Sequence, residues 1–488
     1  MDAGLDAWVN AAVAPLAAAL SAFIFYRVEV FGAELPLVVL WLVAGGVFFT
    51  LRFRFINFRG FGEALRLVRG RGDGGPGEVS HFQALSTAVS GTVGVGNIGG
   101  VAVAISIGGP GAAFWLIVAG ILGMASKFVE CTLGVAYRRH NADGSVSGGP
   151  MYYLERGFAE HGWPRLGRGL GHFYAVGIVI GCLGIGNMFQ SNQAFAQFVA
   201  VTGGADASFF ADKGWLFGLV SAVAVGLVIV GGIRSIARVT SRVVPFMAGL
   251  YLVGCAAMLV LNAEAIPFAL GAIVHGAFAP EGVAGGALGV MILGFQRAVF
   301  SNEAGIGSAT IAHSAVRTNH PVTEGFVALL EPFLDTVIIC TATSLVIVTT
   351  LFYEPDFFAA GIGGVEMTSA AFARNVAWSP RVVTVAAMLF AFSTMISWSY
   401  YGLKGWTYLV GEGRKRALAF NGVFCAFAAL GCMVELEAIL DFSDALVFVI
   451  CVPNILGMVV LAPAVERSLA AYRAAGGAAA GSGDARGA

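Results

Sequence analysis

Two polar segments interrupt apolar stretches of this sequence, and their residue types suit the binding of a small charged ligand. Residues 90–100 (SGTVGVGNIGG) are rich in glycine and carry Thr92 and Asn97, and residues 294–308 (GFQRAVFSNEAGIGS) carry Ser301 ahead of a Gly-x-Gly. Unwound backbone inside a membrane is tolerated where it lines a cavity, and there its amides can hold a carboxylate and its carbonyls a cation. We therefore expect a ligand site at these two breaks.

Two other interpretations of the first break are weaker. Residues 94–99 match the dinucleotide motif G-x-G-x-x-G, but that motif needs a preceding strand and an acid about 20 residues further on. Here apolar sequence flanks the motif on both sides, and the next acid is Glu130. Close helix packing through small residues explains some of the glycines, but it does not explain Thr92 and Asn97 among them.

The composition indicates that these breaks belong to a membrane protein. Hydrophobic residues make up 58% of the chain and charged residues 12%, whereas a soluble domain carries about 25% charge. Apolar runs of 18 or more residues recur along the chain, and this length crosses a hydrocarbon core of about 30 Å. The lipid bilayer is therefore the expected partner, and the net charge of −1 gives no reason to expect nucleic acid.

The apolar runs predict about eleven spanning helices, and the basic residues predict their orientation. With the loop after the first span placed in the cytoplasm, 22 basic residues fall on the cytoplasmic side and four outside. This excess predicts an outside N-terminus and a cytoplasmic C-terminus. Residues 5–25 could form an interfacial helix or a further span. The expected spans are 35–53, 80–108, 111–137, 170–201, 215–232, 243–262, 287–309, 325–352, 381–410, 416–433 and 439–464.

The two breaks predict an inverted repeat. They stand at equivalent places of two five-helix units, 80–262 and 287–464, and five crossings between them give the units opposite orientations. Paired interruptions of this kind are typical of inverted-repeat transporters. The predicted fold is thus an all-α polytopic membrane protein with a five-plus-five core. Its other parts are an N-terminal segment with an interfacial stretch, one extra span and a basic loop (1–79), an external linker (263–286) and a disordered cytoplasmic tail (465–488).

Neither an enzyme nor a tightly bound metal is expected. The sequence has no G-x-S-x-G or H-E-x-x-H, its seven cysteines form no C-x-x-C pair, and its histidines show no ligand spacing. A channel also uses broken helices, but it usually builds its filter from several subunits or repeats around a pore. The paired breaks favour a secondary transporter, for which no organic cofactor and no obligatory protein partner are expected.

Several longer motifs resemble the alanine/glycine:cation symporter family. They are STAVSGTVGVGNIGGVAVAI, VSGGPMYYLERG, GNMFQSN, FSNEAGIGSATIAHSA and LLEPFLDTVIICTATSLVI, and the resemblance runs from about residue 35 to 465. It implies ten core helices in the amino acid–polyamine–organocation arrangement, preceded by one extra span. It also implies symport of alanine or glycine with Na⁺, less often H⁺, by alternating access.

The resemblance also implies roles for individual residues, because residues 92–98 are similar to the first core helix of neurotransmitter:sodium symporters. The amides of Val95 and Gly96 would then face the substrate carboxylate. A sodium site would combine the carbonyls of Ser90 and Val93 with the hydroxyls of Ser393 and Thr394. A further ion site in some relatives would use the Thr92 carbonyl and the Asn97 side chain.

The remaining expected contacts surround the same two breaks. Gln190 is a substrate contact by the resemblance, although a hydrogen bond between helices would also explain it. Trp398 lies one turn after Thr394 and would wall the pocket together with Phe300, unless it packs in the core or at the membrane interface. The expected substrate contacts are Thr92, Val95, Gly96, Asn97, Gln190, Phe300, Ser301, Asn302, Thr394 and Trp398, and the expected sodium ligands are Ser90, Val93, Ser393 and Thr394.

Ionisable residues within the apolar stretches are expected to face the protein interior and to find partners there. Lys127 and Glu130 are three residues apart on one helix and can pair. We expect structural or gating ion pairs for most of this group and keep Glu303 as a candidate for proton coupling. The other members are Arg297, Glu331 and Asp335.

Overall fold

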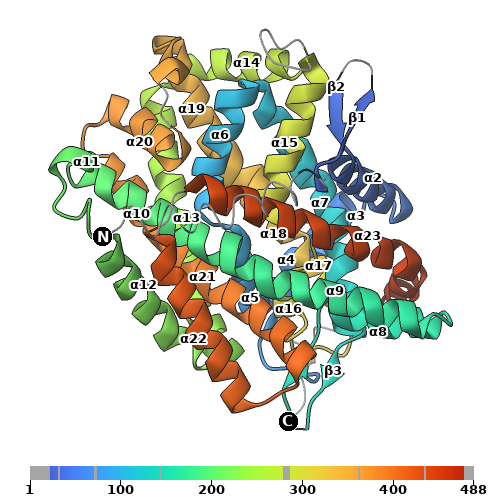
Figure 1. Ribbon diagram of the computed structural model, residues 1–488. Coiled ribbons are helices and arrows are strands. Elements are labelled where there is room, and N and C mark those ends of the chain that lie inside the picture. The colour runs from blue at the N-terminus through green and yellow to red at the C-terminus, as the bar shows by residue number, and fades with distance from the viewer. Residues whose placement is uncertain are drawn as a thin grey trace, which may run out of the picture.

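The computed structural model is a bundle of helices with two short hairpins (Figure 1). It describes residues 22, 24–30, 33–70, 74–142, 144–278, 286–360, 363–433 and 436–476. Most of the N-terminal segment 5–25 and the end of the expected disordered tail therefore lie outside the described residues. Residues 465–474, expected to be the start of that tail, are instead helical and continue the last helix.

The N-terminal part contains one long helix and the basic loop. A two-stranded antiparallel hairpin, β1 (Arg27–Val30) and β2 (Ala33–Pro36), leads into α2 (Leu37–Arg52), at the place of the expected extra span. The basic loop then forms two short helices, α3 (Ile56–Arg59) and α4 (Phe61–Arg69).

The first expected unit contains the first broken helix and four further helical runs. The break divides α5 (His81–Thr92) from α6 (Gly99–Gly108), with the short helix η1 (Val95–Asn97) between them. The other elements are α7 (Gly111–Ala136), β3 (Arg139–His140), β4 (Val146–Ser147), α8 (Pro150–Glu160), α9 (Pro164–Leu183), the π-helical η2 (Gly184–Met188), α10 (Phe189–Val201), α11 (Gly204–Ala207), α12 (Gly214–Ile229) and α13 (Gly232–Leu261).

The second unit contains the second break, which follows α15 (Gly286–Asn302). The elements after it are α16 (Thr310–His313), α17 (Pro321–Ala328), α18 (Leu330–Pro332), the π-helical η4 (Phe333–Cys340), α19 (Thr341–Tyr353), η5 (Phe357–Ala360), α20 (Gly364–Asn375), α21 (Pro380–Val410), α22 (Arg414–Gly431) and α23 (Leu436–Ala474). The linker between the units is partly helical, with η3 (Ala263–Ala265) and α14 (Ile266–Phe278).

Helices occupy the places of all the expected spans, with boundaries that differ by several residues. Among the described residues, six helical segments are long and apolar enough to cross a membrane, and α5 with α6, bent by 61°, makes a seventh. The count of eleven stays a prediction. The six segments are Gly111–Ala136, Pro164–Val201, Gly232–Leu261, Pro321–Tyr353, Pro380–Val410 and Phe448–Ala474.

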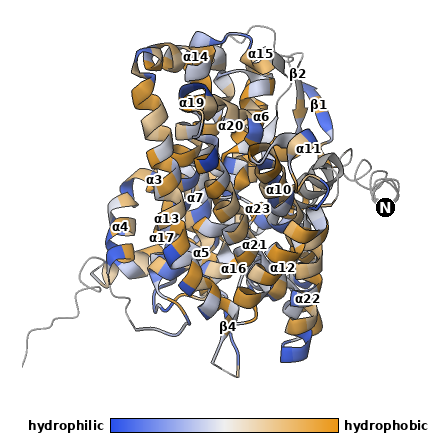
Figure 2. Ribbon diagram, turned by 90° about the vertical axis from the view of Figure 1, so that its left-hand side faces the viewer, coloured by the Kyte–Doolittle hydropathy of each residue, from blue (hydrophilic) through white to orange (hydrophobic). Residues whose placement is uncertain are grey.

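The outer surface of the bundle suits contact with lipid. Leu227 on α12 is 78% exposed and Val260 on α13 is 75% exposed. Hydrophobic residues cover α12 in Figure 2, whereas the first turn of α22, with its basic cluster, is hydrophilic. Large exposed apolar surfaces mark interaction sites, and here the surrounding partner is the hydrocarbon of a bilayer.

Each break has an identifiable local cause. Ser80 and Gln83 form a capping box at the start of α5. The helix ends at Thr92, and glycines occupy several of the positions that follow. In the second break, Glu303 has a φ of 56°, and Gly305 and Gly307 each have a φ of 89°. A non-glycine residue in this left-handed region costs roughly 1–2 kcal/mol. The second break therefore holds local backbone strain at the expected site.

Candidate substrate and cation site

The first break lies against α10 through Gln190. The N–H of Val95 donates to Oε1 of Gln190 over 3.1 Å, and Nε2 of Gln190 donates to the Ile185 carbonyl over 3.0 Å. This π-helical turn of η2 leaves the Ile185 carbonyl available, since a π-bulge interrupts the regular ladder. The structure thus brings Gln190 to the amide that was expected to face the substrate carboxylate.

The second break faces the first through an aromatic ring. A methyl group on Gly96 would lie 3.5 Å from two ring carbons of Phe300, which is ordinary van der Waals contact. Phe300 in turn packs edge-on against Phe189, with 5.4 Å between the ring centroids. The space over Gly96 is therefore bounded by aromatic carbon, as suits a small apolar side chain.

A polar cluster next to Gly96 joins the two breaks through Asn97 and Ser301. Nδ2 of Asn97 donates to Oγ of Ser301 over 3.0 Å and also to the carboxylate of Asp335. Oγ of Ser301 donates to the second carboxylate oxygen over 2.8 Å, and Asn302 donates to Thr336 over 3.0 Å. The structure thus brings together Asn97, Ser301 and Asn302, as expected. Their contact with η4 was not expected.

Sequence reasoning missed the role of Asp335 at this site. It was grouped with the structural ion pairs, but its side-chain partners in the described part of the chain are Asn97, Ser301 and Thr336, without a Lys or Arg. A fully buried carboxylate beside two hydroxyl groups offers the oxygen ligands that hard cations prefer. The signal in the sequence was an acid in the middle of the apolar run FLDTVIIC.

The expected sodium ligands lie together where α5 meets α21. Oγ1 of Thr394 donates to the Ser90 carbonyl over 3.0 Å, and Oγ of Ser90 donates to the Ser393 carbonyl over 2.6 Å. Oγ of Ser393 donates to the Phe390 carbonyl over 3.0 Å within its own helix. Val93 is where α5 ends, so its carbonyl is among those that a helix leaves without an intrahelical donor.

Two of the expected contacts have other partners in the structure. The hydroxyl of Thr92 donates back within α5, at 3.3 Å from the Val89 carbonyl and 3.4 Å from the Ala88 carbonyl. Nε1 of Trp398 donates to the Gly91 carbonyl over 3.1 Å and to Oε1 of Glu303 over 3.0 Å. The indole of Trp398 therefore ties the two breaks to each other.

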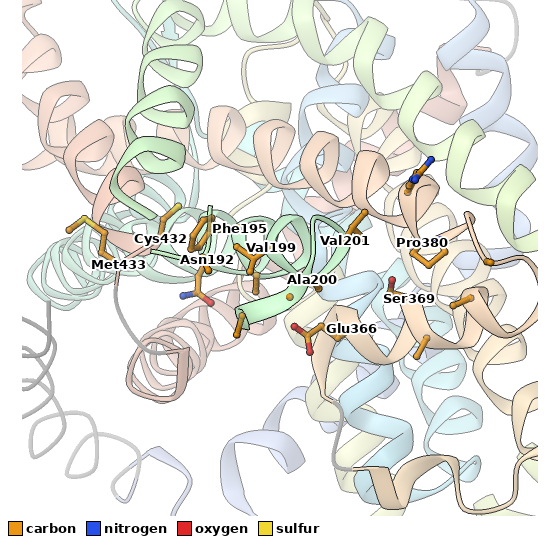
Figure 3. Close-up of a pocket in the computed structure, with 18 residues that line it drawn as sticks. Asn192, Phe195, Val199, Ala200, Val201, Glu366, Ser369, Pro380, Cys432 and Met433 are labelled. Carbon is orange, nitrogen blue, oxygen red and sulfur yellow. The ribbon is translucent and has the colours of Figure 1, made fainter. Parts of the chain in front are cut away.

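A cavity of about 1000 Å³ lies between α10 and α20, and its lining includes no residue of either break (Figure 3). It is bounded by α10, α20, the start of α21 and the end of α22, and Glu366 and Ser369 of α20 line it opposite α10. Nε2 of Gln197 donates to Ser369 over 3.0 Å, and Thr368 donates to the Ile98 carbonyl over 3.0 Å. The helix α20, which lies between the expected spans 325–352 and 381–410, thus covers the start of α6.

The ionisable residues pair across helices more than along them. Nζ of Lys127 lies 2.9 Å from Oε1 of Glu331, so its salt-bridge partner is Glu331 and not the expected Glu130. Glu130 instead accepts from Asn454 of α23 over 2.9 Å. Glu303 accepts from Ser308 as well as from Trp398. All of these groups lie in the protein interior, as expected.

The fold defines the class of the protein. Its structure is similar to that of MhsT in complex with L-phenylalanine, with a TM-score of 0.54 and 16% identity over 80% of this chain and 89% of that one. The all-α polytopic membrane fold is thereby confirmed. With several helices long and apolar enough to cross a membrane, the chain is a multi-pass membrane protein.

Sequence comparison then identifies the family. The model of the sodium:alanine symporter family matches residues 20–481. The sodium/alanine symporter AgcS of Methanococcus maripaludis is 37% identical over 441 residues, which are 90% of this chain and 94% of that protein. The amino-acid carrier protein AlsT of Bacillus subtilis is 38% identical over 363 residues, 74% of this chain and 73% of AlsT. This chain belongs to the sodium:alanine symporter family, as its motifs indicated, and is an amino acid symporter.

The relatives differ in the amino acid that their names give. The probable sodium/glutamine symporter GlnT of Bacillus subtilis is 31% identical over 439 residues, 89% of this chain and 87% of GlnT. Membership of the family therefore leaves open which amino acid this chain carries, and the pocket must decide it.

Proposed function

We propose that this protein carries a small neutral amino acid such as alanine or glycine into the cell together with Na⁺. The observation that carries the proposal is the meeting of the first break with α21, where Thr394 contacts the Ser90 carbonyl over 3.0 Å. Two hydroxyls and two carbonyl groups at this junction supply the oxygen ligands that a hard cation requires.

The substrate would bind across the two breaks. Its carboxylate would take the Val95 and Gly96 amides, displacing the Gln190 oxygen that now accepts from Val95. Its ammonium would face the carbonyls at the end of α15, in Phe300, Ser301 and Asn302. The ring of Phe300 lies within van der Waals contact of a Cβ at Gly96, so it stands directly beside the first break. We therefore assign the wall of the side-chain pocket to Phe300 and Phe189 in the first place.

Sodium would couple to the substrate by joining two parts of the bundle. A cation held by Ser90 and Val93 of α5 and by Ser393 and Thr394 of α21 stabilises the geometry in which both breaks face the ligand. Rocking of one helix bundle against the other then exposes the site on the opposite side. The proposed orientation has the N-terminus outside and the C-terminus in the cytoplasm, in accord with the distribution of basic residues.

Uptake into proteoliposomes tests the proposal. Labelled alanine should accumulate when the external medium contains Na⁺ and the lumen does not, and uptake should saturate with alanine. Replacement of Na⁺ by choline should stop it. Uptake that runs equally well in choline under a pH gradient would instead support the H⁺-coupled alternative, which the buried carboxyls of Asp335 and Glu303 favour. Currents that persist without alanine and do not saturate would indicate a channel.

A further inference from the structure

A chain of buried titratable side chains runs from one end of the first broken helix to the middle of the bundle. Nδ1 of His81 lies 2.5 Å from Oε2 of Glu324, and Oε1 of Glu324 lies 2.6 Å from Nδ1 of His313. Nε2 of His313 lies 3.4 Å from Oε2 of Glu331, whose other oxygen lies 2.9 Å from Nζ of Lys127. We call these five residues the buried chain.

The buried chain has a direction. His81 is the first residue of α5, between the exposed residues Ser80 and Phe82, and it keeps 4% of its surface exposed. The other four members are fully buried. At the inner end, Glu130 lies three residues after Lys127 on α7, and Nδ2 of Asn454 donates both to Glu130 and to the Gly305 carbonyl of the second break, over 2.9 Å each. The buried chain therefore connects one end of the bundle with the ligand site.

The carboxyls around the buried chain outnumber its bases. The acids are Glu324 from α17, Glu331 from α18, Glu130 from α7, Glu303 from the second break and Asp335 from η4. The bases are Lys127 from α7, His313 from α16 and His81 from α5, and α21 contributes the phenol of Tyr401. Even with both histidines charged, these groups would hold more negative than positive charges away from water. An unpaired buried charge is costly, so the excess carboxyls must hold protons or a cation.

At one step of the buried chain, between His313 and Glu331, the two facing atoms are not hydrogen-bonded. Nε2 of His313 and Oε2 of Glu331 face each other at 3.4 Å, and both are buried without a hydrogen-bond partner among the described residues. Buried polar atoms are nearly always paired, so such a pair calls for an explanation. At 3.4 Å the two atoms lie within ion-pair distance, and a proton on either of them would complete the missing hydrogen bond. This step is therefore a place where a proton can be gained or lost.

We propose that the buried chain is a proton relay that exchanges a proton with one face of the protein when cation and amino acid bind. Before binding, one excess proton is held on Oε2 of Glu331, which faces Nε2 of His313, while Oε1 accepts from Nζ of Lys127. A cation that arrives at the Ser90 and Thr394 junction adds a positive charge, so Glu331 gives this proton to Nε2 of His313, and Nδ1 of His313 gives its own to Glu324. Glu324 then gives a proton to Nδ1 of His81, which releases one to solvent. One proton enters and one leaves, and no other bond changes.

Stopped-flow mixing with a pH indicator tests the relay on the full-length protein in detergent. The purified protein in weakly buffered choline chloride is mixed with NaCl and alanine, and binding of labelled alanine is measured on the same sample. The binding measurement tests the proposed function, and the proton signal tests the relay. We expect protons to be released in proportion to the amount of protein. Binding without any release of protons would overturn the proposal.

Two variants and one control locate the signal. His313→Gln keeps a side chain of similar polarity but cannot relay a proton, and should slow the release by roughly 10²-fold, the low end of what a positioned acid–base group contributes. His81→Gln, at the less buried end of the chain, should do the same even if His313→Gln fails to fold. The control is His172→Gln, because His172 is an exposed residue of α9 that does not belong to the buried chain. This variant should release protons at the wild-type rate. Release at the wild-type rate in His81→Gln would show that protons leave by another route.

Discussion

The hydroxyl of Thr394 donates to the backbone carbonyl of Ser90 over 3.0 Å. This contact joins the last turn of α5 to the middle of α21, 304 residues further along the chain. It places a hydroxyl beside a carbonyl close to the end of a helix, where carbonyls lack intrahelical donors. The proposed sodium site therefore lies at the contact between α5 and α21, the two helices that a bound cation would hold together.

The first prediction concerns this junction. Replacing Ser393 and Thr394 together by Ala removes both hydroxyl ligands, and should raise the Na⁺ concentration for half-maximal alanine uptake by at least about 10-fold, as loss of supporting groups does at other metal sites. A sodium titration of uptake in proteoliposomes measures it. Ser399→Ala, which removes a hydroxyl bonded within the same helix, is the matched control. An unchanged sodium dependence in the double variant would remove this site from the mechanism.

The second prediction concerns the backbone of the first break. Gly96→Val should abolish alanine binding, because its side chain would fill the space between the break and Phe300. Gly96→Ala adds only a Cβ, which meets the ring at an ordinary 3.5 Å, so this smaller variant should keep the fold while it still narrows the site. Gly100→Val is the control, because no atom lies within 4 Å of a Cβ there. A scintillation-proximity assay measures the binding of labelled alanine to each variant. Near-normal binding by Gly96→Val would mean that this glycine serves packing alone.

The third prediction separates the two aromatic residues that were expected to wall the pocket. Phe300→Ala should admit leucine and weaken alanine, because the ring beside Gly96 excludes larger side chains. Trp398→Phe should keep leucine out but lower uptake, since Gly91 and Glu303 each lose a donor, at about 1–3 kcal/mol for each buried group left unpaired. Competition of leucine with labelled alanine measures both variants. Leucine binding to Trp398→Phe but not to Phe300→Ala would return the wall to Trp398.

The fourth prediction concerns the carboxylate that joins the two breaks. Asp335→Asn keeps the shape of the side chain but removes its charge, so binding of a cation beside Asn97 and Ser301 should weaken by at least about 10-fold. A sodium titration of labelled alanine binding tests this. Equal sodium affinity in wild type and Asp335→Asn would show that this carboxylate is not a cation ligand.

The fifth prediction concerns stability. Lys127 and Glu331 form a fully buried salt bridge between α7 and α18. Lys127→Met leaves Glu331 without its cation and should destabilise the protein by about 3–5 kcal/mol. The double variant Lys127→Met/Glu331→Gln should recover most of that loss, because no unpaired charge is left. Thermal unfolding of the purified variants measures both, and a single variant as stable as wild type would show that the pair is not structurally important.

The sequence by itself determined the membrane class, the positions of the helices and the two breaks. These features depend on local properties: the length of apolar runs, the glycines after Thr92, and the polar residues in residues 294–308. Ser90 and Thr394 were also placed correctly near each other, because the resemblance to a family carries information on contacts between distant segments.

Only the tertiary structure decided which polar groups meet. Lys127 pairs with Glu331 across helices and not with Glu130 on its own helix, and Asp335 joins the site although its neighbours in sequence are apolar. Trp398 reaches Gly91 and Glu303, so it bridges the breaks. Spacing along a helix shows which residues share a face, but the partner of that face depends on how helices pack. In a low-dielectric interior, every buried charge and donor must find its partner there.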